Sequence, residues 1–179
     1  VLSKCVQSIE SDQFNDNLAF VFTSVGDVDH VDAFAYHQNE LPICLFHYFG
    51  AHNQAIFVDD YLKGPYLLDP FYKACMRRME TGLYRLRDIA PDRFLQSEYY
   101  RSYSIQTGLA EEIRYTFYPP ADVAAVSSTM RSGEHSRFVA PELRVLGSLT
   151  PLVVRRANRQ CRSVQTEVLS RSINDSSQT

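Results

Sequence analysis

The stretch from Tyr66 to Phe94, YLLDPFYKACMRRMETGLYRLRDIAPDRF, contains the features that decide how the chain folds. Asp69-Pro70 interrupts it, and Gly64-Pro65 interrupts the backbone just upstream, because proline lacks a backbone donor and disfavours helical geometry in the residue before it. The part up to about residue 79 is therefore expected to be helical but irregular. The run GLYRLRDI that follows is expected to form a strand, which Pro91 ends.

Two pairs of alternating runs lie outside that stretch and predict β-hairpins. Apolar residues alternate in VDAFAYHQ (31–38) and ICLFHYFG (43–50), and Asn39 and Pro42 separate these runs as turn residues do. In EEIRYTFYPPADVAAVSSTM (111–130), the letters PPAD separate an alternating aromatic run from a run of small and β-branched residues. Each pair is expected to lie antiparallel in one sheet.

Helical spacing is found near both ends of the chain and after the third expected strand. The N-terminal apolar residues recur three and four positions apart: Leu2, Cys5, Val6 and Ile9. Residues 97–108 suit a helix with Ser97 as its N-cap and Gly108 at its end. Residues 142–162 carry a wide apolar stripe on a long helix, which Pro151 is expected to kink.

The order of elements predicts an α+β fold. It runs helix, two strands, irregular helical crossover, strand, helix, two strands and long helix. One antiparallel sheet of about five strands with flanking helices, and with the two terminal helices paired, accounts for this order. We expect one compact domain over residues 1–162, followed by a polar, serine-rich linker over residues 163–179.

Composition narrows the possible functions. The net charge of −3 does not provide the positive potential that concentrates a protein on nucleic acid. The four cysteines are far apart, and the histidines show no metal-ligand spacing, so neither a metal nor another cofactor is expected. No stretch has the roughly 20 apolar residues of a membrane span. A cytoplasmic protein is the simplest interpretation.

Several stretches resemble the N-terminal sensory half of bacterial LuxR-type helix-turn-helix transcriptional regulators. They are LLDPFYKAC, GLYRLRDIAPDRFLQSEYYRSY, LAEEI and APELRVLGSLTPLVV, and the order of elements is similar to that of GAF-type and PAS-type sensor domains. The resemblance implies a small-molecule sensor that precedes a DNA-binding domain and is not an enzyme. No stretch after Arg162 resembles that domain, so DNA contact is expected only through a part outside this sequence.

The resemblance also places a candidate ligand site. The crossover of such domains lies over the open sheet face, so its rings would form a roof and two strand residues a floor. The candidate ligand-binding residues are Phe34 and Tyr36 in the floor, Tyr61, Tyr66, Asp69, Phe71 and Tyr72 in the roof, and Tyr99 and Tyr103 on the next helix.

The chemistry of these residues indicates a cationic ligand. A carboxylate framed by aromatic faces recognises an ammonium group, which favours an amine or an amino-acid-like metabolite. Lactone-binding members of the group have tryptophan in their pockets, and this chain has none. A second interpretation stays open for Asp69, which has the position of an N-cap before a helix that starts at Pro70.

Three further alternatives concern the whole domain. The rings could be packed solid, in which case the domain is a ligand-free scaffold for dimerisation or protein interaction. A homodimer through the terminal helices would suit a palindromic operator. An enzyme would need a reactive thiol, for which Cys75 is the candidate.

Arg85 and Arg87 are expected on one strand face. They are interpreted either as solvent-exposed or acid-paired side chains or as a clamp that binds an anionic group of a ligand.

Overall fold

A five-stranded antiparallel sheet forms the centre of the computed structural model, which describes residues 2–9, 11, 13–37, 40–48, 51–119, 123–133 and 137–162. The strands are β1 (His30–Tyr36), β2 (Ile43–Tyr48), β3 (Gly82–Arg85), β4 (Leu109–Phe117) and β5 (Ala124–Ser132). Their order across the sheet is β2-β1-β5-β4-β3, and each pairing is antiparallel. Both expected hairpins, β1–β2 and β4–β5, are confirmed.

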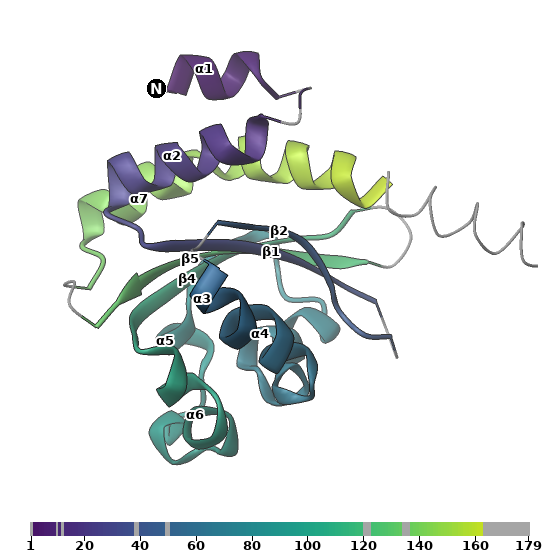
Figure 1. The fold of residues 1–179 in the computed structure, drawn as a ribbon, viewed down its shortest axis with the longest axis vertical. Coiled ribbons are helices and arrows are strands. Elements are labelled where there is room, and N and C mark those ends of the chain that lie inside the picture. Colours follow the sequence, from purple (N-terminus) through teal and green to yellow (C-terminus); the bar gives the residue numbers. More distant parts are fainter. Residues whose placement is uncertain are drawn as a thin grey trace, which may run out of the picture.

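One face of the sheet is covered by the terminal helices. These are α1 (Leu2–Gln7), α2 (Phe14–Gly26), α7 (Ala140–Ser148) and a further helical segment at residues 150–162. Figure 1 shows α2 and α7 lying across the sheet and α1 outside α2. The expected pairing of N-terminal and C-terminal helices is confirmed, and the C-terminal helix is interrupted at Leu149, next to Pro151.

The opposite face is covered by short helices, which we call the roof. They are α3 (Ala51–Gln54), the π-helix η1 (Ala55–Asp60), η2 (Pro65–Leu68), α4 (Pro70–Met76), α5 (Leu86–Ile89), η3 (Phe94–Gln96), α6 (Glu98–Ser102) and η4 (Ser104–Thr107). They lie on the side of the sheet away from α2 and α7 in Figure 1. The irregular crossover is confirmed, and its breaks fall at Gly64 and Asp69, each directly before a proline.

Alternation along the strands divides the buried side chains into two cores. On β4, Ile113, Tyr115 and Phe117 point toward the terminal helices and join a core that includes Phe22 and Leu146. The remaining positions of the sheet point toward the roof, where an aromatic core lies. Because successive strand residues point to opposite faces, one run of sequence supplies both cores.

Two elements differ from the sequence expectation. The helix α2 was not predicted, although Phe14, Leu18 and Phe22 recur at four-residue spacing and are buried in it. The expected strand GLYRLRDI is a strand only to Arg85, because Leu86–Ile89 form the short helix α5. As a consequence, Arg85 and Arg87 do not share a strand face.

A buried arginine ties the sheet to the terminal helices. The Nε atom of Arg131, on β5, donates to the carbonyl of Gly26 at 2.8 Å, and its Nη2 atom donates to Glu142 Oε1, also at 2.8 Å. Its guanidinium lies 4.0 Å from the centroid of the Phe138 ring. Arg131 therefore fixes the end of α2 and the start of α7 against β5.

No helix in the described residues is long and apolar enough to span a membrane.

The terminal-helix core gives the first prediction. Leu146 is fully buried, so Leu146→Ala should lower the free energy of unfolding by about 2–5 kcal/mol through lost contacts and a cavity. Leu95 is 66% exposed, and Leu95→Ala should cost less than about 0.5 kcal/mol. Urea denaturation measures both variants, and equal losses would contradict this assignment of the core.

Candidate functional site

The structure brings all nine candidate site residues into one cluster between the sheet and the roof. Rings from distant parts of the chain are neighbours: the Tyr61 centroid lies 5.1 Å from that of Phe34 and 5.6 Å from that of Tyr103. The Tyr72 ring lies 5.2 Å from that of Tyr36. The members of the cluster are Phe34, Tyr36, Tyr61, Tyr66, Asp69, Phe71, Tyr72, Tyr99 and Tyr103, of which Tyr66 and Tyr72 are half-buried and the others buried.

Asp69 holds the cluster together through both of its carboxylate oxygens. Its Oδ1 atom accepts the backbone N–H of Phe71 at 2.8 Å, so Asp69 caps α4 as the second interpretation expected. Its Oδ2 atom accepts the Tyr61 hydroxyl at 2.7 Å and the Nη1 atom of Arg114 at 2.6 Å. The carboxylate is therefore already paired with a cation of the protein itself.

Two tyrosine hydroxyls close this arrangement into a ring. Tyr61 gives its single proton to Asp69, so the contact of 2.9 Å between the Tyr36 and Tyr61 hydroxyls must use the proton of Tyr36. Arg114 Nη1 in turn donates to the Tyr36 oxygen at 3.4 Å. Each donor in this ring of hydrogen bonds thus has an acceptor, as buried polar groups normally do.

Arg114 lies near the middle of β4 and is 6% exposed. Its Nε atom donates to Glu112 Oε1 at 2.6 Å, and its guanidinium lies 4.7 Å from the centroid of the Phe71 ring. Although burial opposes the charge, the carboxylates of Asp69 and Glu112 hold the pKa of Arg114 well above its ordinary value. Arg114 therefore stays protonated.

A third carboxylate, that of Asp32, faces the same region. Asp32 on β1 and Arg114 on β4 are both opposite Ser128 of β5, so the three residues lie in one row across the sheet. Burial raises the pKa of Asp32 to about 7, against the attraction of Arg114 and with further repulsion from Glu112. Burial likewise raises the pKa of Glu112.

This acidic cluster, consisting of Asp32, Asp69 and Glu112 around Arg114, is not electrically balanced. Within the described roof face, three carboxylates meet one guanidinium, and the Oδ1 atom of Asp32 has no hydrogen-bond partner among the described residues. Buried polar atoms normally have partners. The Ser128 hydroxyl, opposite Asp32 on β5, is a nearby donor that lowers the pKa of Asp32, and the Oδ1 atom can accept a further one. A proton, a water molecule or a cation would supply one.

The space next to the cluster is small. A cavity of about 20 Å³ lies among Asp32, Glu112, Arg114 and the rings of Tyr61 and Tyr103. One water molecule needs about 10–15 Å³, so this cavity holds one water molecule or an ion of similar size. A larger ligand requires a movement of the roof or of the Arg114 side chain.

Sequence reasoning missed the charged members of this site. A signal was present, because Asp32 alternates with apolar residues on β1 and Glu112 and Arg114 alternate with apolar residues on β4. Charges at alternate strand positions are usually interpreted as a solvated face. Here the roof covers that face, so the same positions are buried.

The structure bears on two alternative interpretations, that of Cys75 as a nucleophile and that of Arg87 as part of an anion clamp. Cys75 is 1% exposed, and burial raises the pKa of its thiol to about 12, with Arg114 opposing this shift. A thiol in that state is not a nucleophile at neutral pH. Arg87 lies on α5 with its Nε atom 3.4 Å from Glu111 Oε1, so it is paired with an acid.

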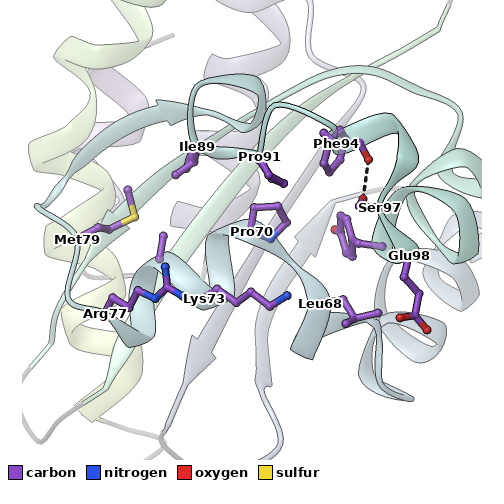
Figure 2. Close-up of a pocket in the computed structure, with 12 residues that line it drawn as sticks. Leu68, Pro70, Lys73, Arg77, Met79, Ile89, Pro91, Phe94, Ser97 and Glu98 are labelled. Atoms are coloured by element: carbon purple, nitrogen blue, oxygen red, sulfur yellow. Dashed lines mark hydrogen bonds between the residues drawn. The ribbon is translucent and has the colours of Figure 1, made fainter.

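A second, larger pocket lies on the outer side of α4. Its volume is about 600 Å³, and it is bounded by α4 and by the segment from Ile89 to Tyr99. Figure 2 shows Lys73 and Arg77 on the helix side and Ile89, Pro91 and Phe94 on the opposite side. We call this pocket the outer groove.

Comparisons with known proteins identify the fold. No protein-family model matches the chain, and no curated protein sequence matches it. Among solved structures, the ligand-binding domain of VqsR from Pseudomonas aeruginosa matches with 24% identity over 90% of this chain and 94% of that one, at a TM-score of 0.74. CepR2 from Burkholderia cenocepacia, an N-acylhomoserine lactone-dependent LuxR family transcription factor, matches with 13% identity over 87% and 90%, at a TM-score of 0.61.

A match outside the transcription factors extends the likeness to GAF-like domains. The red/green cyanobacteriochrome NpR6012g4 matches with 10% identity over 90% of this chain and 97% of that one, at a TM-score of 0.50. The chain therefore has the GAF-like fold of the ligand-binding domains of LuxR-type regulators. The fold that the sequence resemblance implied is confirmed.

The pairing of Asp69 with Arg114 gives the second prediction. Arg114→Met should lower the free energy of unfolding by about 3–5 kcal/mol, because it leaves buried carboxylates without their cation. Asp69→Leu should cost a similar amount, and the double variant should cost clearly less than the sum of the two. Chemical denaturation of the four proteins measures this coupling, and additive losses would show that the two charges do not interact.

The raised pKa of Asp32 gives the third prediction. Between about pH 4 and pH 7, the folded protein keeps a proton on Asp32 that the unfolded chain releases, so the free energy of unfolding falls as the pH rises through that window. Relative to wild type, Asp32→Asn should gain roughly 2 kcal/mol between pH 5 and pH 8, since each pKa unit is worth about 1.4 kcal/mol.

A surface acid provides the control for this pH dependence. Asp92 is exposed, so Asp92→Asn makes the same change in charge without removing a buried carboxylate. Thermal melts of both variants and of wild type at pH 5 and pH 8 make the comparison. If Asp32→Asn follows the wild-type pH dependence, the Asp32 carboxyl does not have the raised pKa assigned to it.

Proposed function

We propose that this chain is the effector-sensing domain of a LuxR-type transcriptional regulator, and that its effector is a small cationic amine or an amino-acid-like metabolite. The observation that carries the proposal is the acidic cluster, in which three buried carboxylates face one guanidinium. Burying three carboxyl groups beside one guanidinium is costly, and burial raises the pKa of both Asp32 and Glu112. Groups with pKa values perturbed in this way cluster at functional sites. The fold shared with VqsR and CepR2 supports the sensing role.

The charge of the cluster selects the class of effector. Asp69 and Glu112 are both paired with Arg114, so the carboxylate left to receive a ligand cation is that of Asp32. Tyrosine rings line the same cavity, and ring faces attract cations by about 0.5–2 kcal/mol each. An anionic effector would add negative charge to a site that already contains more carboxyl groups than cations.

The effector acts by a shift between conformations. The cavity of about 20 Å³ holds an ammonium group but not the rest of a metabolite, so binding selects a state in which the roof has opened. A ligand shifts such an equilibrium only as far as it binds one state better than the other. The nine ring and acid residues, Phe34, Tyr36, Tyr61, Tyr66, Asp69, Phe71, Tyr72, Tyr99 and Tyr103, are the residues that this opening rearranges.

The terminal helices would transmit the effector signal to the DNA-binding domain. In this proposal the chain acts in the cytoplasm as a homodimer through these helices, and residues 163–179 link the domain to a DNA-binding helix-turn-helix domain. Phe20 of α2 is 58% exposed and Val6 of α1 is 48% exposed, which gives the dimer an apolar surface. A two-fold symmetric sensor would match two half-sites of a palindromic operator.

One observation favours a second candidate function. A cavity that holds a single water molecule is what a ligand-free scaffold would have, and in that case the domain serves only for dimerisation or protein interaction. The two functions make opposite predictions for ligand binding. The scaffold has no effector, whereas the sensor is stabilised by one.

A thermal-shift screen distinguishes the sensor from the scaffold. Its panel holds ammonium, amines, polyamines and amino acids, with small carboxylates for comparison. A ligand at 100 times its dissociation constant stabilises the fold by about 2.7 kcal/mol, which gives a clear upward shift of the melting temperature. Shifts confined to the cationic compounds support the sensor, and no shift across the panel supports the scaffold.

Matched variants then locate the site. Asp32→Asn should weaken binding of the amine that gives the largest shift by at least about tenfold, because an ion pair at the buried oxygen is lost. Asp92→Asn removes an exposed acid and should leave the affinity unchanged. Equal affinity for wild type and Asp32→Asn would contradict the proposed site while leaving the sensing role intact.

A further inference from the structure

The outer groove is separate from the acidic cluster, although both touch α4. Helical spacing divides this helix into two sides: Asp69, Phe71 and Cys75 point toward the sheet, whereas Lys73 and Arg77 line the groove. The Tyr99 ring, which is 4% exposed, contributes to the walls of both spaces. The groove has about 600 Å³, within the range of roughly 300–1,000 Å³ that is typical of small-molecule sites.

One wall of the outer groove is apolar. Ile89, Pro91 and Phe94 form the wall that faces α4, and Met79 closes one end (Figure 2). Leu68 adds a further apolar side chain next to the helix. Apart from Pro91, which is exposed, these side chains are half-buried, so a ligand that covers them removes apolar surface from water.

The other wall carries two cations. Lys73 lies on α4 and Arg77 is the residue that caps its C-terminal end, four positions later, so the two lie on one face of the helix, about one turn from each other. Both are exposed, and neither forms an ion pair with any of the described residues. Exposed cations alone are ordinarily just solvated. Their position opposite a continuous apolar wall is what distinguishes this groove.

Glu98 sets the direction of a ligand in the groove. It lies with Ser97 at the end of the groove away from Arg77 and Met79 (Figure 2). Lys73 and Arg77 would attract a negative headgroup to the α4 side of the groove. Glu98 would repel it toward the end near Arg77 and Met79. An apolar body then extends along Ile89, Pro91 and Phe94.

We propose that the outer groove is a second small-molecule site, which binds an amphipathic monocarboxylate such as a medium-chain fatty acid. The carboxylate pairs with Lys73 and Arg77, and the hydrocarbon chain covers the apolar wall. This ligand differs in charge from the cationic effector of the acidic cluster. The two sites therefore take different compounds, and neither depends on the other for its recognition chemistry.

Calorimetric titration of the 179-residue chain with decanoate, below its critical micelle concentration, tests the proposal. Saturable binding at one site is expected, with affinity rising from butanoate through hexanoate to decanoate. Decylammonium should bind at least tenfold more weakly than decanoate. Absence of saturable decanoate binding, or equal affinity for decylammonium, would overturn the proposal.

Paired charge variants locate the carboxylate. Lys73→Gln/Arg77→Gln should weaken decanoate binding at least tenfold. Lys4→Gln/Arg144→Gln also removes one lysine and one arginine, both exposed on helices that cover the other face of the sheet, and should change the affinity less than twofold. An equal loss in both double variants would indicate non-specific attraction and refute the site. Thermal melts confirm that each variant is folded.

A third variant separates this inference from the proposed effector site. Asp32→Asn alters the acidic cluster and should leave decanoate binding within twofold of wild type. A change in decanoate affinity in Asp32→Asn, in either direction, that is as large as the change in Lys73→Gln/Arg77→Gln would place the carboxylate in the acidic cluster instead, and would refute the outer groove as its site.

Discussion

The buried ion pair between Arg114 and Asp69 connects the sheet to everything on its roof side. Arg114 rises from the middle strand positions of β4, and Asp69 begins α4, so a contact of 2.6 Å fixes the helix at one distance from the sheet. The cost of burying both charges is offset by bonds from Tyr61, Phe71 and Glu112 to the pair. The aromatic side chains then pack around a polar centre whose geometry is already set.

The same pair determines what the site can do. Because the guanidinium pairs with both Asp69 and Glu112, the carboxylate without a cation is that of Asp32, and the remaining space is about 20 Å³. In the proposed sensor, part of the binding free energy of an amine is used to open the roof. The apparent affinity is reduced in proportion to how rarely the open state is populated. Such a sensor responds only to compounds whose binding free energy exceeds the cost of opening the roof.

Local patterns predicted the strands because their signals are local, whereas the aromatic cluster was placed through the family resemblance. Period-two alternation located β1, β2 and β4, small and β-branched residues located β5, and the prolines at 65 and 70 located the breaks of the crossover. The pairing of Asp69 with Arg114 joins residues 45 positions apart, and no spacing rule reports such a contact. Asp32 and Glu112 were missed for a related reason, since alternation tells which residues share a face but not whether another layer covers that face. The short helix α5 forms within an apparent strand because its residues leave the sheet after Arg85.

The most direct measurement of the central claim is the carboxyl titration of Asp32, followed by ¹³C NMR in the free domain and with a saturating amine. We expect this carboxyl to titrate near pH 7 in the free domain, and a bound ammonium group to lower its pKa by at least about one unit, because an adjacent positive charge favours the ionised form. A free-domain pKa near 4, or a value near 7 that does not change when the amine binds, would contradict the assignment of an uncompensated acidic cluster as the effector site.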